Sequence, residues 1–307
     1  MHSGEPSNAN LQITREARGR VRADGINLTF GYWPGRGAPV IALHGLTASY
    51  VNFIGIAECL AGRAPLLGFD LRGRGDSDKP EGPYGLAQHA RDVAAAMREM
   101  GLGPCVIAGH SMGAFVAAAL AAQEPELVAG LVLIDGGFPL RMPAGVSVEV
   151  GLGAALAQRI TQLRQEYPSR KEYREFWRTQ PNFPQKEWNP WVEAFLDYEV
   201  GGESPVRPKA SEAAVREDLG EAFQPQAVLD RLKKIRVPTM MLRAEKGFTK
   251  DQPALYPDDV LAEMKELVPG IEDHKLAGTT HYTIVLGEKA AAKTADLICE
   301  MADRIKS

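Results

Sequence analysis

The feature that most constrains this fold is a series of short apolar runs without any alternation of polar and apolar residues. Such runs are typical of strands buried on both faces, as in a parallel sheet covered by helices. They lie at residues 40–43, 65–69, 106–108, 131–134 and 237–242. Helical patterns lie between and after them, at 86–100, 112–123, 260–267 and 290–305. This alternation predicts an α/β fold with a doubly wound, mostly parallel sheet and helices on both faces.

The chain enters this sheet through strands of a different kind. Residues 20–22 and 26–33 carry an alternating pattern and are separated by Asp24-Gly25, a favoured tight-turn pair. They predict a short antiparallel start to the sheet. The polar residues before them predict a flexible N-terminal tail over residues 1–18.

Residues 139–225 break the rhythm, because they contain no convincing buried strand and are rich in proline and tryptophan. A loop of this length is improbable in a compact domain, so we expect a helical lid inserted into a core of residues 19–138 and 226–307. Trp188 and Trp191 are three residues apart and can share a helix face. They either pack the lid against the core or form an aromatic wall that binds substrate.

Composition and charge exclude several classes of function. A net charge of -4 gives no basic face for nucleic acid, and no run approaches the roughly 18 apolar residues of a membrane span. The first residues lack the basic and apolar regions of a secretory signal, so we expect a cytoplasmic protein. Three scattered cysteines predict neither a disulfide scaffold nor a zinc site. No cofactor is expected, because no G-x-G-x-x-G follows the first strand.

The sequence Gly109-His110-Ser111-Met112-Gly113 joins a predicted strand to a predicted helix. A strand that turns sharply into a helix strains its corner residue, and glycines two positions away remove the resulting collisions. The Ser111 hydroxyl then lies beyond the carboxyl end of its strand, where open α/β sheets place their ligands. This context predicts that Ser111 is a nucleophile.

A second loop, Leu43-His44-Gly45-Leu46, ends an earlier strand. A backbone N–H after that strand can point to the same space as the N–H after Ser111. We therefore expect the amides of Leu46 and Met112 to form an oxyanion hole, which is worth several kcal/mol of barrier in a dry site.

These motifs, with Asp70-Leu71-Arg72-Gly73-Arg74-Gly75-Asp76-Ser77 and Thr280-His281-Tyr282, make the chain resemble the α/β-hydrolase superfamily over roughly residues 20–305. The resemblance implies an eight-stranded sheet, a helical cap after strand six, and the order nucleophile, acid, histidine along the chain. It implies that Ser111 is the nucleophile and His281 the catalytic histidine. A serine at this corner argues against epoxide hydrolases and haloalkane dehalogenases, whose corner residue is aspartate.

The triad acid has three candidates. Most members of the superfamily carry it shortly after strand seven, but Gly247 stands at that position here. A minority, including lactonases that open resorcylic-acid lactones, carry it at the end of strand six, where this chain has Asp135. We predict Asp135, with Glu245 and Asp251 as alternatives, since a triad needs only a buried carboxylate that reaches the histidine.

The other histidines and charged residues are expected to be structural. His44 and His110 are predicted to be buried supports of the oxyanion loop and of the serine corner. His89 is predicted to lie on a solvated helix face. Asp70 and Arg72 are predicted to pair with each other.

The sequence therefore predicts a metal-independent serine hydrolase (an esterase or lactonase) that cleaves a bulky or aromatic small-molecule ester or lactone through an acyl-enzyme. Alternatives are a carbon–carbon bond hydrolase of the meta-cleavage type, whose members usually keep the strand-seven aspartate, a cofactor-free perhydrolase, and a non-catalytic receptor. The sequence names no substrate and no oligomeric state.

Overall fold

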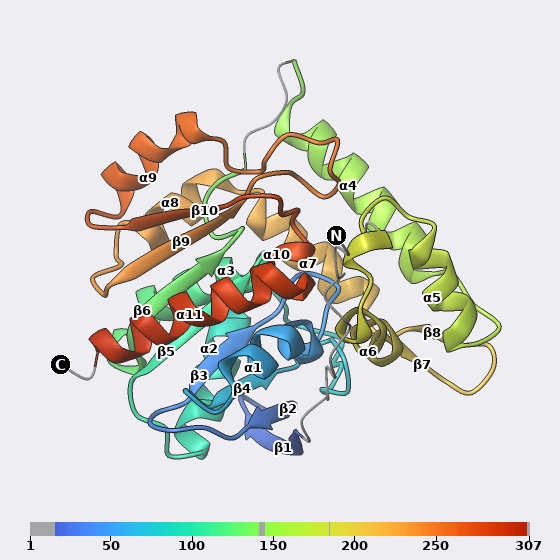
Figure 1. Ribbon diagram of the computed structural model, residues 1–307, viewed down its shortest axis with the longest axis horizontal. Coiled ribbons are helices and arrows are strands. Elements are labelled where there is room, and N and C mark those ends of the chain that lie inside the picture. Colours follow the sequence, from blue (N-terminus) through green and yellow to red (C-terminus); the bar gives the residue numbers. More distant parts are fainter. Residues whose placement is uncertain (1–15, 141–144, 184, 306–307) are drawn as a thin grey trace, which may run out of the picture.

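Eight strands form one sheet in the order β1-β2-β4-β3-β5-β6-β9-β10 (Figure 1). The computed structural model describes residues 16–140, 145–183 and 185–305. The strands are β1 (Ala17–Ala23), β2 (Ile26–Trp33), β3 (Val40–Leu43), β4 (Leu66–Phe69), β5 (Cys105–His110), β6 (Val128–Ile134), β9 (Thr239–Ala244) and β10 (Glu272–Leu276). Pairs β1–β2 and β2–β4 are antiparallel and the others are parallel. The predicted α/β architecture with an eight-stranded, mostly parallel sheet is confirmed.

The apolar runs are buried for the reason the sequence predicts. Every residue of β3, β4, β5 and β9 is buried, because helices cover both faces of the sheet centre. The outer strands β1 and β10 are partly exposed and carry charged residues. Charges on outer strands are a common protection against pairing with other chains.

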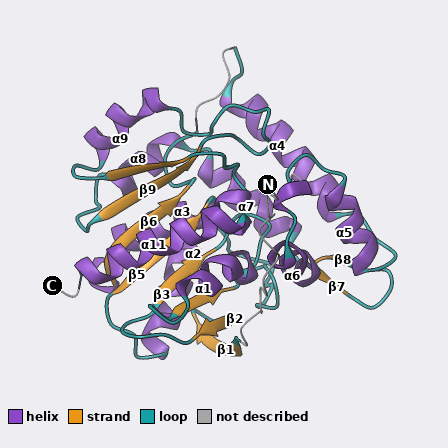
Figure 2. Cartoon of the chain, in the orientation of Figure 1, coloured by secondary structure: helices purple, strands orange, loops and turns teal. Residues whose placement is uncertain are grey.

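Two layers of helices enclose the sheet (Figure 2). One face packs against α1 (Ile54–Leu60), α10 (Thr283–Leu286) and α11 (Glu288–Arg304). The other face packs against α2 (Leu86–Glu99), α3 (Met112–Gln123), α8 (Pro225–Leu232) and α9 (Leu261–Leu267). Helix α3 is apolar all round because it lies between the sheet and α2 and α8. Short 3₁₀ helices occur at Tyr50–Phe53, Pro125–Leu127, Gln185–Glu187 and Asp258–Val260.

The chain between β6 and α8, here called the inserted segment, lies beside the sheet and is mostly helical (Figure 1). It contains α4 (Val148–Leu163), α5 (Arg170–Arg178), α6 (Pro190–Glu199) and α7 (Glu212–Ala222). The side chains of Ser147, Ser169, Asn189 and Ser211 accept hydrogen bonds from backbone N–H groups at the four helix starts. The sequence did not predict its two-residue strands β7 (Val200–Gly201) and β8 (Arg207–Pro208), which are too short to leave a pattern.

Three further details differ from the sequence expectations or extend them. Strand β1 begins at Ala17, inside the predicted tail, whose residues 1–15 lie outside the described part of the chain. Helices α1 and α10 were not predicted, because seven and four residues are too few for a clear period. None of the helices in the described residues is long and apolar enough to cross a membrane.

Candidate active site

Ser111 stands at the sharp corner between β5 and α3, with φ 55° and ψ −121°. The neighbouring glycines allow the backbone to come as close as this corner requires, because a side chain at either position would collide with it. A Cβ atom on Gly109 would lie 2.3 Å from the Gly113 carbonyl oxygen, and one on Gly113 would lie 1.9 Å from the Leu43 carbonyl oxygen. The Ser111 N–H donates to the Ile134 carbonyl of β6 at 2.9 Å. The strained corner is therefore fixed by tight packing on both sides.

Asp135 follows β6 directly and is 1% exposed. Its φ of 45° turns the side chain out of the strand direction. The backbone of β9 holds it in place, because its N–H donates to Leu242 at 2.8 Å and its Oδ1 accepts from the Ala244 N–H at 3.1 Å. Its Oδ2 lies 2.7 Å from Nδ1 of His281. The carboxylate thus bridges the neighbouring strand and the histidine.

His281 lies in the loop between β10 and α10 and is 3% exposed. Its N–H donates to the Gly247 carbonyl at 2.9 Å, and its ring contacts those of Phe248 and His110, with centroids 4.6 and 4.7 Å away. Since Nδ1 is engaged by Asp135, Nε2 is the ring nitrogen that can exchange a proton with a reacting group. Residues 110, 111, 135 and 281 thus gather at the carboxyl ends of β5 and β6.

The other two carboxylates considered for the triad point elsewhere. Glu245 Oε2 accepts from the Gly278 N–H at 2.6 Å, and Asp251 is exposed. Gly247 occupies a position where a side chain does not fit, because a Cβ there would lie 2.6 Å from the Pro253 carbonyl oxygen. Of the three candidates, the structure brings Asp135 to His281.

The two predicted oxyanion residues flank Ser111. The loop after β3 passes beside the serine, since a Cβ on Gly45 would lie 3.3 Å from Ser111 Cβ and 3.6 Å from its Oγ. Leu46 follows Gly45, and Met112 is the first residue of α3. Both backbone segments therefore adjoin the serine.

Two buried histidines support these loops. His44 donates from Nδ1 to the Gly45 carbonyl at 2.7 Å and accepts at Nε2 from the Leu71 N–H at 3.0 Å. Burial lowers the pKa of His44 to about 3. His110 contacts Asn52 at Nδ1 and the His281 carbonyl at Nε2, and burial lowers its pKa well below the usual value. Both rings are neutral parts of the scaffold.

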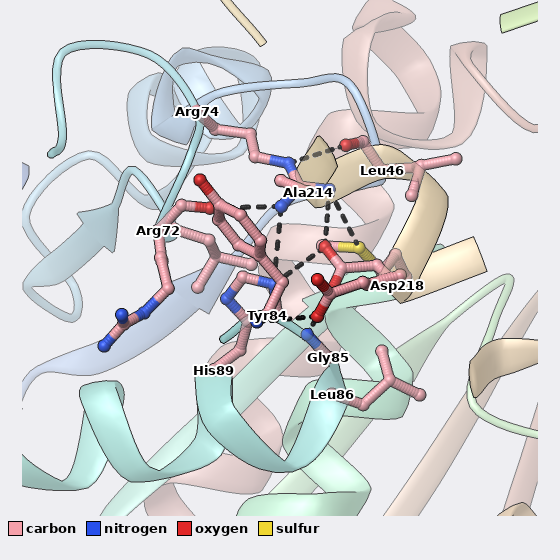
Figure 3. Close-up of polar contacts among 12 residues, drawn as sticks. Leu46, Arg72, Arg74, Tyr84, Gly85, Leu86, His89, Ala214 and Asp218 are labelled. Carbon is pink, nitrogen blue, oxygen red and sulfur yellow. Dashed lines mark hydrogen bonds and ion pairs between the residues drawn. The ribbon is translucent and has the colours of Figure 1, made fainter. Parts of the chain in front are cut away.

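Arg74 connects the oxyanion region to the inserted segment (Figure 3). Its side chain is completely buried and donates from Nε to the Leu46 carbonyl at 2.9 Å, while Nη2 lies 3.9 Å from Met112 Sδ. The same Nη2 lies 2.5 Å from Asp218 Oδ2 on α7. Burial alone would raise the pKa of Asp218, but the charge of Arg74 and the interactions with His89 lower it to about 2.

The structure corrects two expectations for this region. His89 is not solvated: it is 0% exposed, and its Nε2 lies 2.8 Å from Asp218 Oδ2, because α7 covers this face of α2. Asp70 and Arg72 do not pair with each other. Arg72 forms a bidentate ion pair with Asp92, at 2.6 and 2.7 Å. Asp70 instead accepts hydrogen bonds from the N–H groups of residues 50 and 76 and from the hydroxyl of residue 198.

A pocket, here called the aromatic pocket, lies between the inserted segment and the loops of the site. Its aromatic lining residues are Tyr167, Tyr173, Phe176, Trp177, Phe183, Phe195 and Tyr282. A chain of ring contacts connects it to the histidine: Phe183 is 5.1 Å from Tyr282, whose ring is 5.7 Å from that of His281. Thr47, the residue after Leu46, also lines it. Sequence reasoning missed this pocket, although the density of aromatic residues at 167–183 was a signal.

Trp188 and Trp191 are not among the residues that line this pocket. Trp191 is 2% exposed and packs on Gly55 of α1, where a Cβ atom would lie 2.7 Å from its Cε3. Trp188 donates to Glu193 at 2.8 Å and lies under Arg178, whose Cζ is 4.3 Å from the ring centroid. These placements fit the packing alternative, and we give neither residue a substrate-binding role.

Comparison with known proteins assigns the family. A model of the alpha/beta hydrolase fold matches residues 38–288. The chain belongs to the α/β-hydrolase family. Within it, the chain is 27% identical over 257 residues to the 2-(acetamidomethylene)succinate hydrolase of Mesorhizobium japonicum, covering 81% of this chain and 83% of the relative. A crystal structure of E-2-(acetamidomethylene)succinate hydrolase has a TM-score of 0.77 at 23% identity and covers 94% of this chain and 100% of that one.

A more local similarity is to a lipase. The sn-1-specific diacylglycerol lipase of Mus musculus is 35% identical over 121 residues, which is 38% of this chain and 37% of the relative. The family and these relatives support a hydrolytic enzyme that acts on a small molecule.

Proposed function

We propose that this α/β hydrolase is a serine hydrolase that cleaves a carboxylic ester or lactone through a covalent acyl-enzyme. The observation that carries the proposal is the buried hydrogen bond of 2.7 Å between Asp135 and His281, beside the strained corner at Ser111. A nucleophile, a base and a group that orients the base are the parts that this chemistry needs.

In the proposed mechanism, Nε2 of His281 takes the proton of Ser111 as its Oγ attacks the carbonyl carbon. Asp135 stays ionised, holds the imidazole through Nδ1 and stabilises the imidazolium. The N–H groups of Leu46 and Met112 stabilise the oxyanion. His281 then protonates the leaving alcohol, activates a water molecule and allows the acid to leave Ser111.

The inserted segment, predicted as a lid over 139–225, supplies the substrate pocket in this proposal. The aromatic pocket beside Tyr282 has a cavity volume of about 50 Å³, so the side chains that line it would have to move apart to admit the apolar part of a bulky or aromatic substrate. A lactone keeps its alcohol and acid in one molecule after ring opening, so it needs such a pocket next to the serine. Aromatic side chains give large apolar contact at little cost in conformational entropy.

A second candidate is cleavage of a bond other than an ester by the same serine. The relative named 2-(acetamidomethylene)succinate hydrolase favours it, because that name denotes an acetamido compound and not an ester. The carbon–carbon hydrolase alternative is also part of this second candidate. In that reaction the acyl group is bonded to carbon, and not to an ester oxygen, before it is transferred to water. In these reactions Ser111 would again accept the acyl group, and the proton that His281 gives to an alcohol in ester cleavage would go to the leaving nitrogen or carbon instead.

The test is labelling by a fluorophosphonate probe, followed by turnover on a panel of p-nitrophenyl esters, lactones, N-acyl enamines and vinylogous diketones. We expect the native protein to be labelled at Ser111. We also expect it to hydrolyse an ester or a lactone faster than any N-acyl enamine or vinylogous diketone of the panel. Ser111→Ala should lose labelling and about 10³-fold or more in kcat. A folded native protein that is never labelled would be a binding protein and not a hydrolase. Faster turnover of an enamide or a diketone would select the second candidate.

A further inference from the structure

The aromatic pocket contains a buried carboxyl oxygen without a normal hydrogen bond. Glu199 is the last residue of α6 and lines the pocket. Its Oε1 is inaccessible to solvent and makes no hydrogen bond of normal length within the described residues, and the polar side chain that interacts with this carboxyl is Ser49. A buried acceptor without a normal hydrogen bond costs about 1–3 kcal/mol, which makes a structural role for this carboxyl costly. A ligand in the pocket would supply the missing hydrogen bond.

The same pocket contains a donor without a normal hydrogen bond. The indole Nε1–H of Trp177 is also buried and makes no hydrogen bond of normal length within the described residues, and the polar side chain that it interacts with is Tyr173. Its ring continues the chain of aromatic contacts towards the histidine, since it lies 5.9 Å from Phe183. An acceptor and a donor that make no normal hydrogen bond thus lie among rings that favour a flat apolar group.

The charges around the pocket decide which polar group fits. Arg159 lines the pocket, with its guanidinium 5.8 Å from the Phe248 ring and 3.5 Å from the Tyr282 hydroxyl, so it would repel a cationic substituent. Burial raises the pKa of Glu199 to about 8, so the carboxyl is neutral at pH 7 and can both donate and accept. A neutral group that can do the same is the matching partner.

We propose that the aromatic pocket binds an aromatic ring that carries a neutral hydroxyl group, with the Glu199 carboxyl as the hydrogen-bond partner of that hydroxyl. The Trp177 N–H is a second polar contact for the same part of the substrate. The proposal rests on the serine hydrolase function, since it takes this pocket as the substrate pocket of that enzyme. It makes Glu199 a specificity-determining residue.

The test measures binding without turnover, by titration calorimetry on Ser111→Ala protein. The ligands are methyl phenylacetate, its 3-hydroxy and 4-hydroxy derivatives, and its cationic 4-aminomethyl derivative. We expect one hydroxylated ester to bind roughly tenfold more tightly than the parent, because a site that hydrogen-bonds a hydroxyl discriminates against the analogue without it. In Ser111→Ala/Glu199→Leu this ratio should fall to about one, and Ser111→Ala/Glu199→Gln should recover part of it.

Two further variants complete the design. Trp177→Phe, which keeps the ring and removes the N–H, should reduce the ratio and stands in if the leucine variant fails to fold. Trp188→Phe, a tryptophan outside the pocket, should leave the ratio unchanged. Equal binding of parent and hydroxylated esters, tightest binding of the cationic ester, binding of none of them, or an unchanged ratio in the Glu199→Leu and Trp177→Phe variants would each overturn the proposal. Fluorophosphonate labelling of the native protein reports separately on the serine hydrolase function.

Discussion

Arg74 and Asp218 form an ion pair of 2.5 Å in which neither side chain is exposed. The pair joins the loop after β4 to helix α7 of the inserted segment. Because the same guanidinium also donates to the Leu46 carbonyl and approaches Met112, the inserted segment is linked to both proposed oxyanion residues. The position of α7 and the geometry of the oxyanion loop are therefore coupled.

Asp218→Asn should destabilise the protein by about 3 kcal/mol, because it leaves the Arg74 guanidinium buried without its counter-charge. It should also lower kcat more than it raises KM, since the oxyanion loop acts in the transition state. Urea unfolding and ester kinetics measure the two effects. Glu212→Gln is the matched control, because Glu212 lies on the same helix as Asp218 and its ion pairs with Arg164 and Arg216 are at the surface. This substitution should cost less than about 1 kcal/mol. Equal effects of the two substitutions would contradict the coupling.

The choice of triad acid gives a second prediction. Asp135→Asn should lower kcat by roughly 10³-fold or more, because an amide favours the wrong tautomer of His281. Glu245→Gln should change kcat only a few-fold, since Glu245 bonds to the Gly278 N–H. The double variant Asp135→Asn/Gly247→Asp should not recover activity, because a side chain at 247 collides with the Pro253 carbonyl. A larger loss of kcat in Glu245→Gln would move the acid to the loop after β9.

The parts of this protein that can be predicted from its sequence are those that depend on local sequence patterns. The strands of the sheet are short runs whose burial depends on their own composition, and the corner at Ser111 is contained in five consecutive residues. The candidates for the triad acid could be reduced, because this chain has Gly247 at the position after strand seven where most members of the superfamily carry the acid. Each of these signals lies within a few residues of the feature that it predicts.

Contacts between segments that are distant along the chain could not be predicted from the sequence. His89 has the pattern of a solvated helix position, and it is buried only because Asp218, 129 residues later, packs on it. The aromatic pocket combines residues of three inserted helices with Thr47 and Tyr282 from the core. No local pattern indicates which aromatic residues of the inserted segment face the site and which pack on the core.

Trp191 on α6 and Trp188 just before it show that neighbouring aromatic residues can have different surroundings. They give a third prediction. Trp191→Ala should cost about 3–5 kcal/mol in unfolding free energy, because it opens a cavity against α1. Trp188→Ala should cost about 1 kcal/mol, mainly through the lost contact with Arg178. Neither should raise KM for bulky aromatic esters more than for acetate esters. A selective rise in KM for the bulky esters in Trp188→Ala would return that residue to the substrate site.

The buried carboxyl of Glu199 gives a prediction on stability against pH. Its folded pKa of about 8 lies above the ordinary value of 4.5, so the folded state binds the proton more tightly than the unfolded state. The resulting stabilisation is fully present below about pH 4.5 and is lost as the pH rises through 8. His44, whose folded pKa is lowered to about 3, has the opposite effect, with stability that rises up to about pH 6.5.

The charged groups Asp70 and Lys209 also act on the Glu199 carboxyl. The difference between native protein and Glu199→Gln isolates the carboxyl, because these two groups and His44 are the same in both. We expect urea unfolding between pH 5 and 9 to show that the native protein loses stability relative to Glu199→Gln, by up to a few kcal/mol at the alkaline end. Glu193→Gln on the same helix, whose carboxylate pairs with Arg178, should run parallel to the native protein. Parallel curves for native protein and Glu199→Gln would mean that the carboxyl is ionised throughout, and the pocket would then present a negative charge to its ligand.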